Sequence, residues 1–208
     1  MPIGTSWRAP VVLMLLNDPS RAFLRMNRLC SAFTMSVIIL GSASGWPNAI
    51  LNWLPANTSR GMPSGSVNDG VLIQDLTSLS FRDHEFDAVV ATEVLEHIPD
   101  YMAALREVAR ALRPGGKALF SFPWRGVLHR KNVQRAEVLP DGSIRHIEPP
   151  EYHEDPASPE GVLCYWHFGW TVLDDIRSAG FSDASASFLF SPLNGHMSVL
   201  SPVVVALR

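Results

Sequence analysis

The sequence predicts an α/β fold with a mostly parallel sheet, a C-terminal antiparallel hairpin and an incomplete N-terminal part. Residues 86–124 read as strand, helix and strand, which is typical of two parallel strands joined by a crossover helix. Near the C-terminus, ASASFLFSP and SPVVVALR read as two further strands. The chain between them leaves no room for a helix, so we expect this pair to be antiparallel.

The size and composition are those of one ordinary globular domain. The chain has 208 residues, of which 47% are hydrophobic and 18% are charged. A net charge of −3 indicates neither a nucleic-acid surface nor a membrane surface. The run VVLMLL is much shorter than the ~20 apolar residues that span a bilayer. Two cysteines form no disulfide framework, so we expect a cytoplasmic location.

Charge is unevenly spread along the chain. Residues 1–68 carry five arginines and one acid, whereas residues 69–208 carry twelve basic and nineteen acidic residues. No Asp or Glu occurs from Pro19 to Asn68. We therefore divide the chain into an atypical N-terminal segment, residues 1–64, and an α/β domain, residues 65–208.

The first third contains few clear elements. Residues 20–33 have apolar side chains at helical spacing, with Ser20 as N-cap. MSVIIL predicts a buried strand at 35–40, and PNAILNWL predicts a helix at 47–54 with Pro47 in its first position. A loop rich in Ser, Gly, Pro and Asn follows, and GVLIQDL at 70–76 predicts a short strand.

The elements after residue 85 are better defined. FDAVVAT predicts a strand, and PDYMAALREVARAL predicts an amphipathic helix that starts near Asp100 and stops at RPGG. KALFSFP predicts the next strand, and TVLDDIRSAGF predicts a second helix that ends at Gly180. Residues 125–165 are polar and broken by prolines, so we interpret them as a lid or an insertion.

Ligands of such sheets bind at the carboxyl ends of the strands. This rule selects three stretches, QDL, ATEVLEHIP and SFPW, each of which follows a predicted strand.

These stretches carry a family resemblance. VLIQDLTSLSFRDHEFDAVVATEVLEHIPDYMAALREVARALRPGGKALFSFPW resembles class I S-adenosylmethionine-dependent methyltransferases of the broad small-molecule type called methyltransferase type 11. The tail GVLCYWHFGWTVLDDIRSAGF with its two final strands resembles the same family, so the likeness covers roughly Gly65 to Arg208. It implies a Rossmann-like methyltransferase sheet and S-adenosylmethionine as the cofactor.

The resemblance also implies roles for individual residues. Asp75 matches the acid that accepts from the adenine amino group, and the Leu76 N–H faces the adjacent ring nitrogen. Ala91 and Thr92 match the backbone beside the methionine part of the cofactor. In the LEH turn below the methyl-transfer site, Glu96 and His97 are the catalytic candidates.

The residues themselves leave other interpretations open. Asp75 also fits a cap of the turn after its strand. Glu93 and Glu96 lie three apart, as on one helical face or in a solvated first turn. His97 fits either a general base or a packed histidine that bonds a neighbouring loop.

Two groups of residues in the tail allow further interpretations. Phe168 and Trp170 fit core contacts of the last helix better than the floor of an acceptor pocket. The spacings of the histidines and Cys164 match no zinc pattern, so we predict no metal site.

The expected glycine-rich turn D/E-x-G-x-G is missing. The nearest candidate is VIILGSASGW, in which Gly41 follows a strand but no acid precedes it. Two explanations compete: a variant with altered cofactor contacts or lost catalysis, or an N-terminal third that is not in the ancestral reading frame. The charge break near Asp69 favours the second.

The predicted function is methyl transfer from S-adenosylmethionine to a small-molecule acceptor, without nucleic-acid or membrane partners. The alternative is a non-catalytic methyltransferase-like remnant or partner-binding domain. A different nucleotide-binding enzyme is disfavoured, because the sequence has no phosphate-binding loop.

Overall fold

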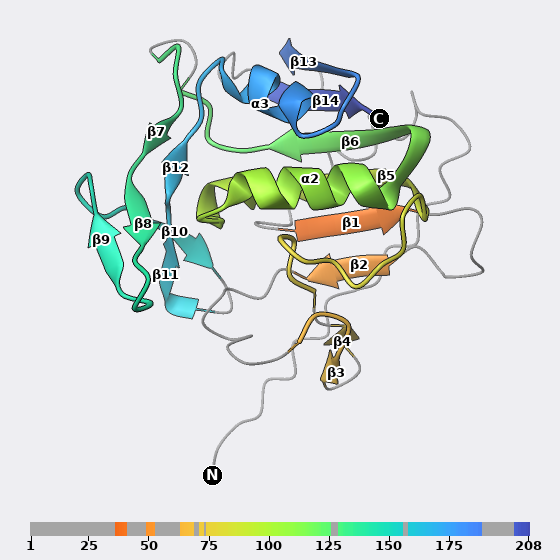
Figure 1. Cartoon of the computed structure of the whole chain (residues 1–208). Helices are drawn as coiled ribbons and strands as arrows, with labels where there is room; N and C mark the ends of the chain where they lie inside the picture. The colour runs from red at the N-terminus through yellow and green to blue at the C-terminus, as the bar shows by residue number, and fades with distance from the viewer. Residues whose placement is uncertain are drawn as a thin grey trace, which may run out of the picture.

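A six-stranded sheet forms the centre of the computed structural model, in the order β13-β14-β6-β5-β1-β2 (Figure 1). The structure describes residues 36–40, 49–52, 63–68, 71–72, 74–125, 129–155, 158–188 and 202–208. The sheet strands are β1 (Ser36–Leu40), β2 (Ala49–Asn52), β5 (Phe86–Thr92), β6 (Leu112–Ser121), β13 (Asp183–Phe188) and β14 (Pro202–Leu207).

The sheet is mixed rather than mostly parallel. Among the described strands of this sheet, only β5 and β6 run parallel, and helix α2 (Tyr101–Ala111) makes the crossover between them. The pairs β1–β2, β1–β5, β14–β6 and β13–β14 are all antiparallel. The α/β class and the C-terminal hairpin are therefore confirmed. The parallel part is smaller than predicted, because β1 enters the sheet in the opposite direction to β5.

Helix α2 forms where the amphipathic pattern predicts it. The Asp100 carboxylate caps its start by accepting from the Ala103 N–H at 2.9 Å. Leu105 and Val108 are fully buried against the sheet, whereas Met102 is only partly buried. The helix ends at Ala111, because Leu112 is already extended and opens β6.

Helix α3 (Val172–Ser178) packs on the same core. Val172 and Ile176 are buried, and Phe168 lies with them in the apolar cluster. The turn after the helix uses Gly180 at φ +112°, a conformation that glycine adopts without strain. The predicted helix stop at this glycine is therefore confirmed.

Two predicted elements before residue 85 differ from the structure. The helix predicted over 47–54 is wrong, because Ala49–Asn52 form strand β2 and pair with β1. A short run such as AILN fits a strand or a helix by pattern alone, and here its main chain pairs with β1. The strand predicted over 70–76 is reduced to β4 (Val71–Leu72), which pairs with β3 (Val67–Asn68) outside the main sheet. The helix predicted over 20–33 lies outside the described residues.

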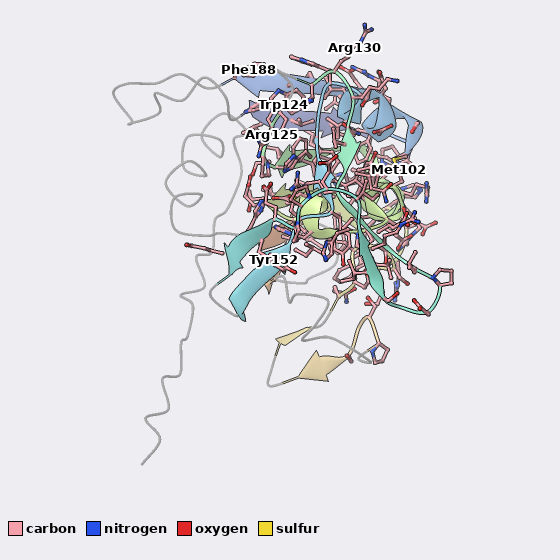
Figure 2. The ribbon with its side chains drawn as sticks, turned by 90° about the vertical axis from the view of Figure 1, so that its left-hand side faces the viewer. Met102, Trp124, Arg125, Arg130, Tyr152 and Phe188 are labelled. Atoms are coloured by element: carbon pink, nitrogen blue, oxygen red, sulfur yellow. The ribbon has the colours of Figure 1, made fainter. Side chains whose placement is uncertain are left out.

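The segment 125–165, here called the excursion, folds into short antiparallel pairs. It lies at the end of the sheet where β5 and β6 finish (Figure 1), and Tyr152 projects from it, 54% exposed (Figure 2). The strands of the excursion are β7 (Val133–Gln134), β8 (Ala136–Val138), β9 (Ile144–His146), β10 (Tyr152–Asp155) and β11 (Ser158–Leu163). Strand β12 (Trp166–His167) follows directly and pairs with β7.

The excursion is fastened to the chain that leaves β5. The Tyr165 N–H donates to the Glu96 carbonyl at 2.7 Å, and the Trp166 indole donates to the Pro99 carbonyl at 3.0 Å. These bonds hold β11 and β12 against the turn that leads into α2. A lid function for the excursion stays a prediction, as does the domain boundary at residue 64. No helix in the described part of the chain is long and apolar enough to cross a membrane.

Candidate functional site

The candidate site lies at the carboxyl ends of β5 and β6, the only parallel pair among the described strands. Thr92 and Ser121 are opposite each other in this pair. The Glu93 N–H donates to the Ser121 carbonyl at 2.9 Å, and the Ser121 hydroxyl donates to Glu93 Oε1 at 2.9 Å. This is the edge at which ligands of open α/β sheets bind.

Glu93 is the most unusual residue at this edge. Its φ of +51° puts a non-glycine residue in the left-handed region, where strain is often associated with function. Burial, helped by the nearby charge of Glu96, raises the pKa of Glu93 to about 7. A carboxyl group of that pKa can accept and return a proton near neutral pH.

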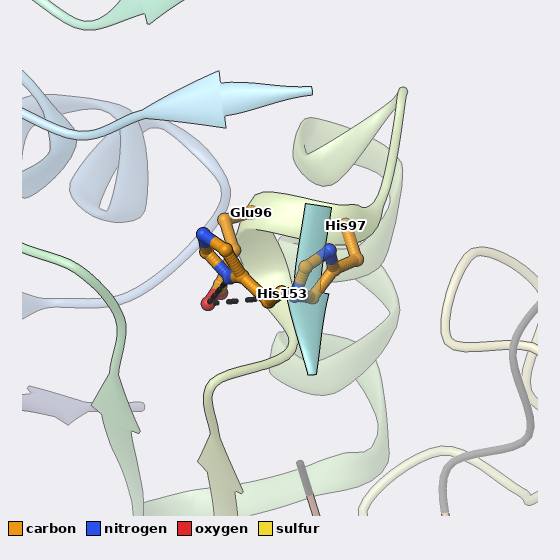
Figure 3. A group of neighbouring side chains, drawn as sticks. All are labelled: Glu96, His97 and His153. Carbon is orange, nitrogen blue, oxygen red and sulfur yellow. Dashed lines mark ion pairs between the residues drawn. The ribbon is translucent and has the colours of Figure 1, made fainter. Parts of the chain in front are cut away.

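Glu96 and His97 lie next along the chain in the short helix η1 (Leu95–His97), and both are buried (Figure 3). Glu96 is 0% exposed, and burial raises the pKa of its carboxyl group. His97 Nδ1 lies 2.8 Å from the Leu163 carbonyl of β11. A carbonyl only accepts, so Nδ1 carries the proton. This contact supports the interpretation of His97 as a packed histidine that bonds a neighbouring segment.

His153 of β10 completes a group that the sequence does not reveal. Its Nδ1 lies 3.7 Å from Glu96 Oε1, and His97 Nε2 lies 3.7 Å from the same oxygen. The two imidazole rings meet edge to face, with 4.8 Å between their centroids. Figure 3 shows both rings turned toward the Glu96 carboxylate.

Glu151 holds His153 from the other side. Its Oε1 lies 3.1 Å from His153 Nε2, and its Oε2 lies 3.0 Å from His167 Nε2. Arg135 adds an ion pair at 3.3 Å. Although burial alone would raise it, the hydrogen bonds from the two histidines hold the pKa of Glu151 below its ordinary value. Glu151 is therefore an ionised acceptor that orients His153.

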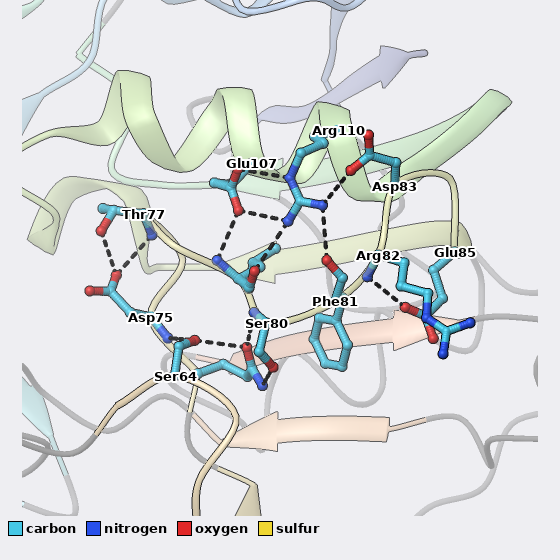
Figure 4. Close-up of polar contacts among 12 residues, drawn as sticks. Ser64, Asp75, Thr77, Ser80, Phe81, Arg82, Asp83, Glu85, Glu107 and Arg110 are labelled. Atoms are coloured by element: carbon cyan, nitrogen blue, oxygen red, sulfur yellow. Dashed lines mark hydrogen bonds and ion pairs between the residues drawn. The ribbon is translucent and has the colours of Figure 1, made fainter.

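The predicted adenine contacts lie in a turn after β4. Asp75 is exposed, and its Oδ1 accepts from the Thr77 N–H at 2.8 Å and from the Thr77 hydroxyl at 2.7 Å (Figure 4). This is the turn-capping arrangement left open for Asp75, and Leu76 beside it is buried. An Asp75 N–H bond to the Ser64 hydroxyl at 3.2 Å ties the turn to the preceding segment.

The other predicted residues fall in two groups. Ala91 and Thr92 are 1% and 7% exposed at the end of β5, next in the chain to Glu93. Gly41 lies outside the described residues. The roles predicted for Asp75, Leu76, Ala91, Thr92, Gly41, Glu96 and His97 stay predictions.

Three residues of the site were not assigned to it from the sequence: Glu93, His153 and Glu151. The spacing of the two acids in TEVLEH drew attention to Glu93. The sequence alone, however, suggested only that Glu93 and Glu96 share a helical face or lie in a solvated turn. His153 and Glu151 approach only because β10 folds back over η1. No local pattern reports that contact.

The aromatic residues of the tail divide into core and surface. Phe168 is fully buried and contacts Tyr101 and Phe122, with ring centroids 5.1 and 4.6 Å away, so its predicted core role is confirmed. Trp170 is 41% exposed and meets Trp124 edge to face at 5.0 Å, so a core role for Trp170 is wrong. Its ring also lies 6.2 Å from that of Phe188, the last residue of β13.

Comparison with known proteins agrees with this geometry. Residues 56–120, which include β5, α2 and most of β6, match the family Methyltransf_11, described as a methyltransferase domain. The resemblance to class I S-adenosylmethionine-dependent methyltransferases is thereby confirmed for this part of the chain.

Similar individual proteins are also methyltransferases by name. The chain is 34% identical over 105 residues to a demethylmenaquinone methyltransferase of Mycolicibacterium gilvum, covering 48% of this chain and 43% of that protein. It is 33% identical over 118 residues to the 27-O-demethylrifamycin SV methyltransferase of Amycolatopsis mediterranei, covering 50% and 43%. The matched part thus spans less than half of these relatives.

Among solved structures, an S-adenosylmethionine-dependent methyltransferase from Mesorhizobium loti has a TM-score of 0.42 and 17% identity. The likeness covers 76% of this chain and 78% of that one.

Proposed function

We propose that this protein transfers a methyl group from S-adenosylmethionine to a small-molecule acceptor at the carboxyl ends of β5 and β6. The observation that carries the proposal is the family match over 56–120, which includes β5 and most of β6. These two strands end at Thr92 and Ser121, beside the half-buried acid Glu93. The similar methyltransferases named above act on small molecules, which supports the same acceptor class.

The charge at this edge fits the cofactor. S-adenosylmethionine supplies a methyl group on a positively charged sulfonium. Burial raises the pKa of both Glu93 and Glu96, and a bound cation would favour their ionised forms. The half-buried carboxyl group of Glu93 and the fully buried one of Glu96 therefore make this end of β5 a suitable neighbour for a cation.

The chain's residues would then divide the work. The second carboxylate oxygen of exposed Asp75 and the Leu76 N–H bind the adenine edge, since one accepts and the other donates. Ala91 and Thr92 line the methionine part with backbone. Glu93 takes a proton from an acceptor that must lose one. The charge of buried Glu96 helps to keep the pKa of Glu93 near neutral pH, and His97 fixes the turn that carries both acids through its bond to the Leu163 carbonyl.

Aromatic side chains beside β6 suit an apolar acceptor. Trp124 stacks on Phe122 at 6.0 Å and meets Trp170. The Trp124 indole N–H is buried without a hydrogen-bond partner among the described residues. An acceptor with a flat apolar face and one oxygen would contact these rings and accept from that N–H.

Calorimetry with S-adenosylhomocysteine tests the proposal on the full chain. Binding is expected for the wild type, and Asp75→Ala should weaken it by at least about tenfold, since one lost hydrogen bond of about 1.4 kcal/mol corresponds to that factor. Asp141→Ala is the matched control, because Asp141 Oδ1 accepts from the Ser143 N–H at 2.9 Å and hydroxyl at 2.6 Å in a similar exposed turn.

The outcomes separate the two candidate functions. No binding of S-adenosylhomocysteine at millimolar concentration would reject an active methyltransferase and favour the non-catalytic, partner-binding alternative. Equal affinities of Asp75→Ala and wild type would reject the adenine site while leaving methyl transfer open. A cytoplasmic location stays a prediction.

A further inference from the structure

We propose that Glu96, His97 and His153 bind a zinc ion that ties the excursion to the end of β5. The proposal concerns metal binding alone and does not depend on methyl transfer. One oxygen or nitrogen from each of these residues lies within 4.8 Å of the others (Figure 3).

The Glu96 carboxylate is buried and faces two imidazole rings. It is 0% exposed, and among the described residues neither oxygen has a partner within hydrogen-bond distance, so that its closest partners are the longer ion-pair contacts with His97 and His153. Burying a carboxylate without compensation is costly, so such a group is normally paired or bound to a metal. The atoms that face it are imidazole nitrogens, at 3.7 Å in both cases.

In both histidines, the ring nitrogen that points away from Glu96 has a protein partner. His97 Nδ1 donates to the Leu163 carbonyl at 2.8 Å, and His153 Nε2 faces the Glu151 carboxylate at 3.1 Å. Each ring therefore uses its far nitrogen as a donor and directs the other nitrogen toward Glu96. Metal-binding histidines usually have this arrangement, in which a carbonyl or carboxylate fixes the tautomer.

The ligand types and distances select the metal. Two imidazoles and one carboxylate suit zinc, whereas magnesium and calcium prefer oxygen ligands alone. Zinc bonds of about 2.0–2.2 Å place neighbouring ligand atoms about 3.3 Å apart, so each Glu96–histidine pair, now at 3.7 Å, must close by roughly 0.4 Å. The two imidazole nitrogens, which lie within 4.8 Å of each other, must approach as well. Three protein ligands leave one position for water.

No short sequence pattern predicts this zinc site. Glu96 and His97 come from η1 and His153 comes from β10, so the ligands share no short spacing. The prediction of no metal site rested on spacing, and the fold brings the ligands together across the excursion. Zinc at this place would fasten β10 directly over the turn that follows β5.

Metal analysis of the purified full chain, followed by titration of the chelated protein with zinc chloride, tests the proposal. The wild type should bind a stoichiometric amount of zinc. His153→Gln and Glu96→Gln should each weaken binding by more than about 100-fold, since the loss of an outer-shell partner alone typically costs 10- to 100-fold. Glu151→Gln changes only the carboxylate that faces His153 Nε2, so it should weaken zinc binding by about 10- to 100-fold.

Two controls make the result decisive. His146→Gln removes an exposed histidine of β9 outside the cluster and should keep wild-type affinity. Substitution with cobalt should give visible bands of a low-coordinate site without the near-ultraviolet band of a thiolate ligand, because Cys164 is not a ligand. If circular dichroism shows Glu96→Gln to be unfolded, the partly exposed His153 variant decides.

The proposal is overturned if the wild type binds no zinc, or if His153→Gln binds as tightly as His146→Gln. A cobalt–thiolate band would also overturn it, since His153 lies in a second group with Glu151 and Cys164. Zinc binding is read without S-adenosylhomocysteine. Failure here therefore leaves the methyltransferase proposal intact, and failure of cofactor binding leaves the zinc site intact.

Discussion

The Glu107 carboxylate and the Arg110 guanidinium, one turn apart on α2, form a two-point pair with distances of 2.9 Å (Nε–Oε1) and 2.8 Å (Nη2–Oε2). Both also bind the segment that follows Asp75. Glu107 accepts from the Leu79 N–H at 2.9 Å, and Arg110 donates to the Phe81 carbonyl at 2.9 Å. The pair therefore binds the segment after the Asp75 turn to helix α2 (Figure 4).

Replacing Arg110 should loosen that segment. Arg110→Ala removes donors from the Leu79 and Phe81 carbonyls and from Asp83, and should cost about 1–3 kcal/mol of unfolding free energy. Arg110→Lys should not restore it, because an ammonium cannot reproduce the fork. Urea unfolding measures the loss, and exposed Arg106→Ala, 4.0 Å from Asp100, should change stability by less than about 0.5 kcal/mol. Equal losses in the two alanine variants would contradict this role.

The same pair predicts an acid-sensitive contribution to stability. Hydrogen bonds from Arg110 lower the pKa of Glu107 below its ordinary value of 4.5. The folded protein thus binds fewer protons here than the unfolded chain. The stabilisation is complete above the unfolded value and is lost as pH falls through the folded value. The Tm difference between wild type and Glu107→Gln should therefore shrink as pH falls below the ordinary glutamate pKa of 4.5. A constant difference would argue against an ionised Glu107.

Glu93 should affect the pH dependence of stability in the direction opposite to Glu107. An unfolded glutamate titrates near 4.3, whereas the pKa of Glu93 in the fold is about 7. Between these values the folded state binds more protons, so stability falls as pH rises through this window and stays lowered above it.

Glu93→Gln should remove that cost and keep an acceptor for the Ser121 hydroxyl. We expect the variant to be more stable than wild type at about pH 8, by on the order of 2–3 kcal/mol, and the gain to vanish near pH 4. Urea unfolding across this range measures it. A gain that does not depend on pH would show that the strained backbone, and not the carboxyl charge, is responsible.

The β10/β11 hairpin depends on a glycine next to His153. Gly161 has φ +77°, and a Cβ there would lie 2.6 Å from the His153 carbonyl. Gly161→Ala should destabilise the protein by more than the ~1–2 kcal/mol cost of a left-handed alanine, since β10 must also move. Thermal unfolding and the histidine NMR signals report the two effects.

Gly142 provides the matched control for this change. It has a similar φ of +81°, but nothing lies within 4 Å of an added Cβ. Gly142→Ala should show only the backbone cost and leave the His153 signals unchanged. If both alanine variants behave alike, the close approach to His153 has no energetic weight.

Much of the fold follows from local patterns in the sequence. The β5–α2–β6 unit, helix α3 and the β13/β14 hairpin all form where periodicity, an N-cap at Asp100 and a stop at Gly180 indicate. These signals are local, because side-chain period and capping depend on residues a few positions apart. The same β5–α2–β6 unit also predicts that a ligand binds at the carboxyl end of β5, after Thr92.

Other features depended on contacts between distant segments. Pairing with β1 makes 49–52 a strand, and the turn at Asp75 replaces the predicted end of a sheet strand. The distinction between an acid that caps its own turn and one that faces a ligand requires its neighbours to be known.

The sequence by itself determined the resemblance to a methyltransferase family, the parallel unit and the end of the sheet at which to look. Only the tertiary structure decided that Glu96, His97 and His153 meet, and that burial raises the pKa of Glu93. The physical reason is that periodicity reports which face of an element is apolar, whereas the approach of β10 to η1 depends on the path of the whole excursion.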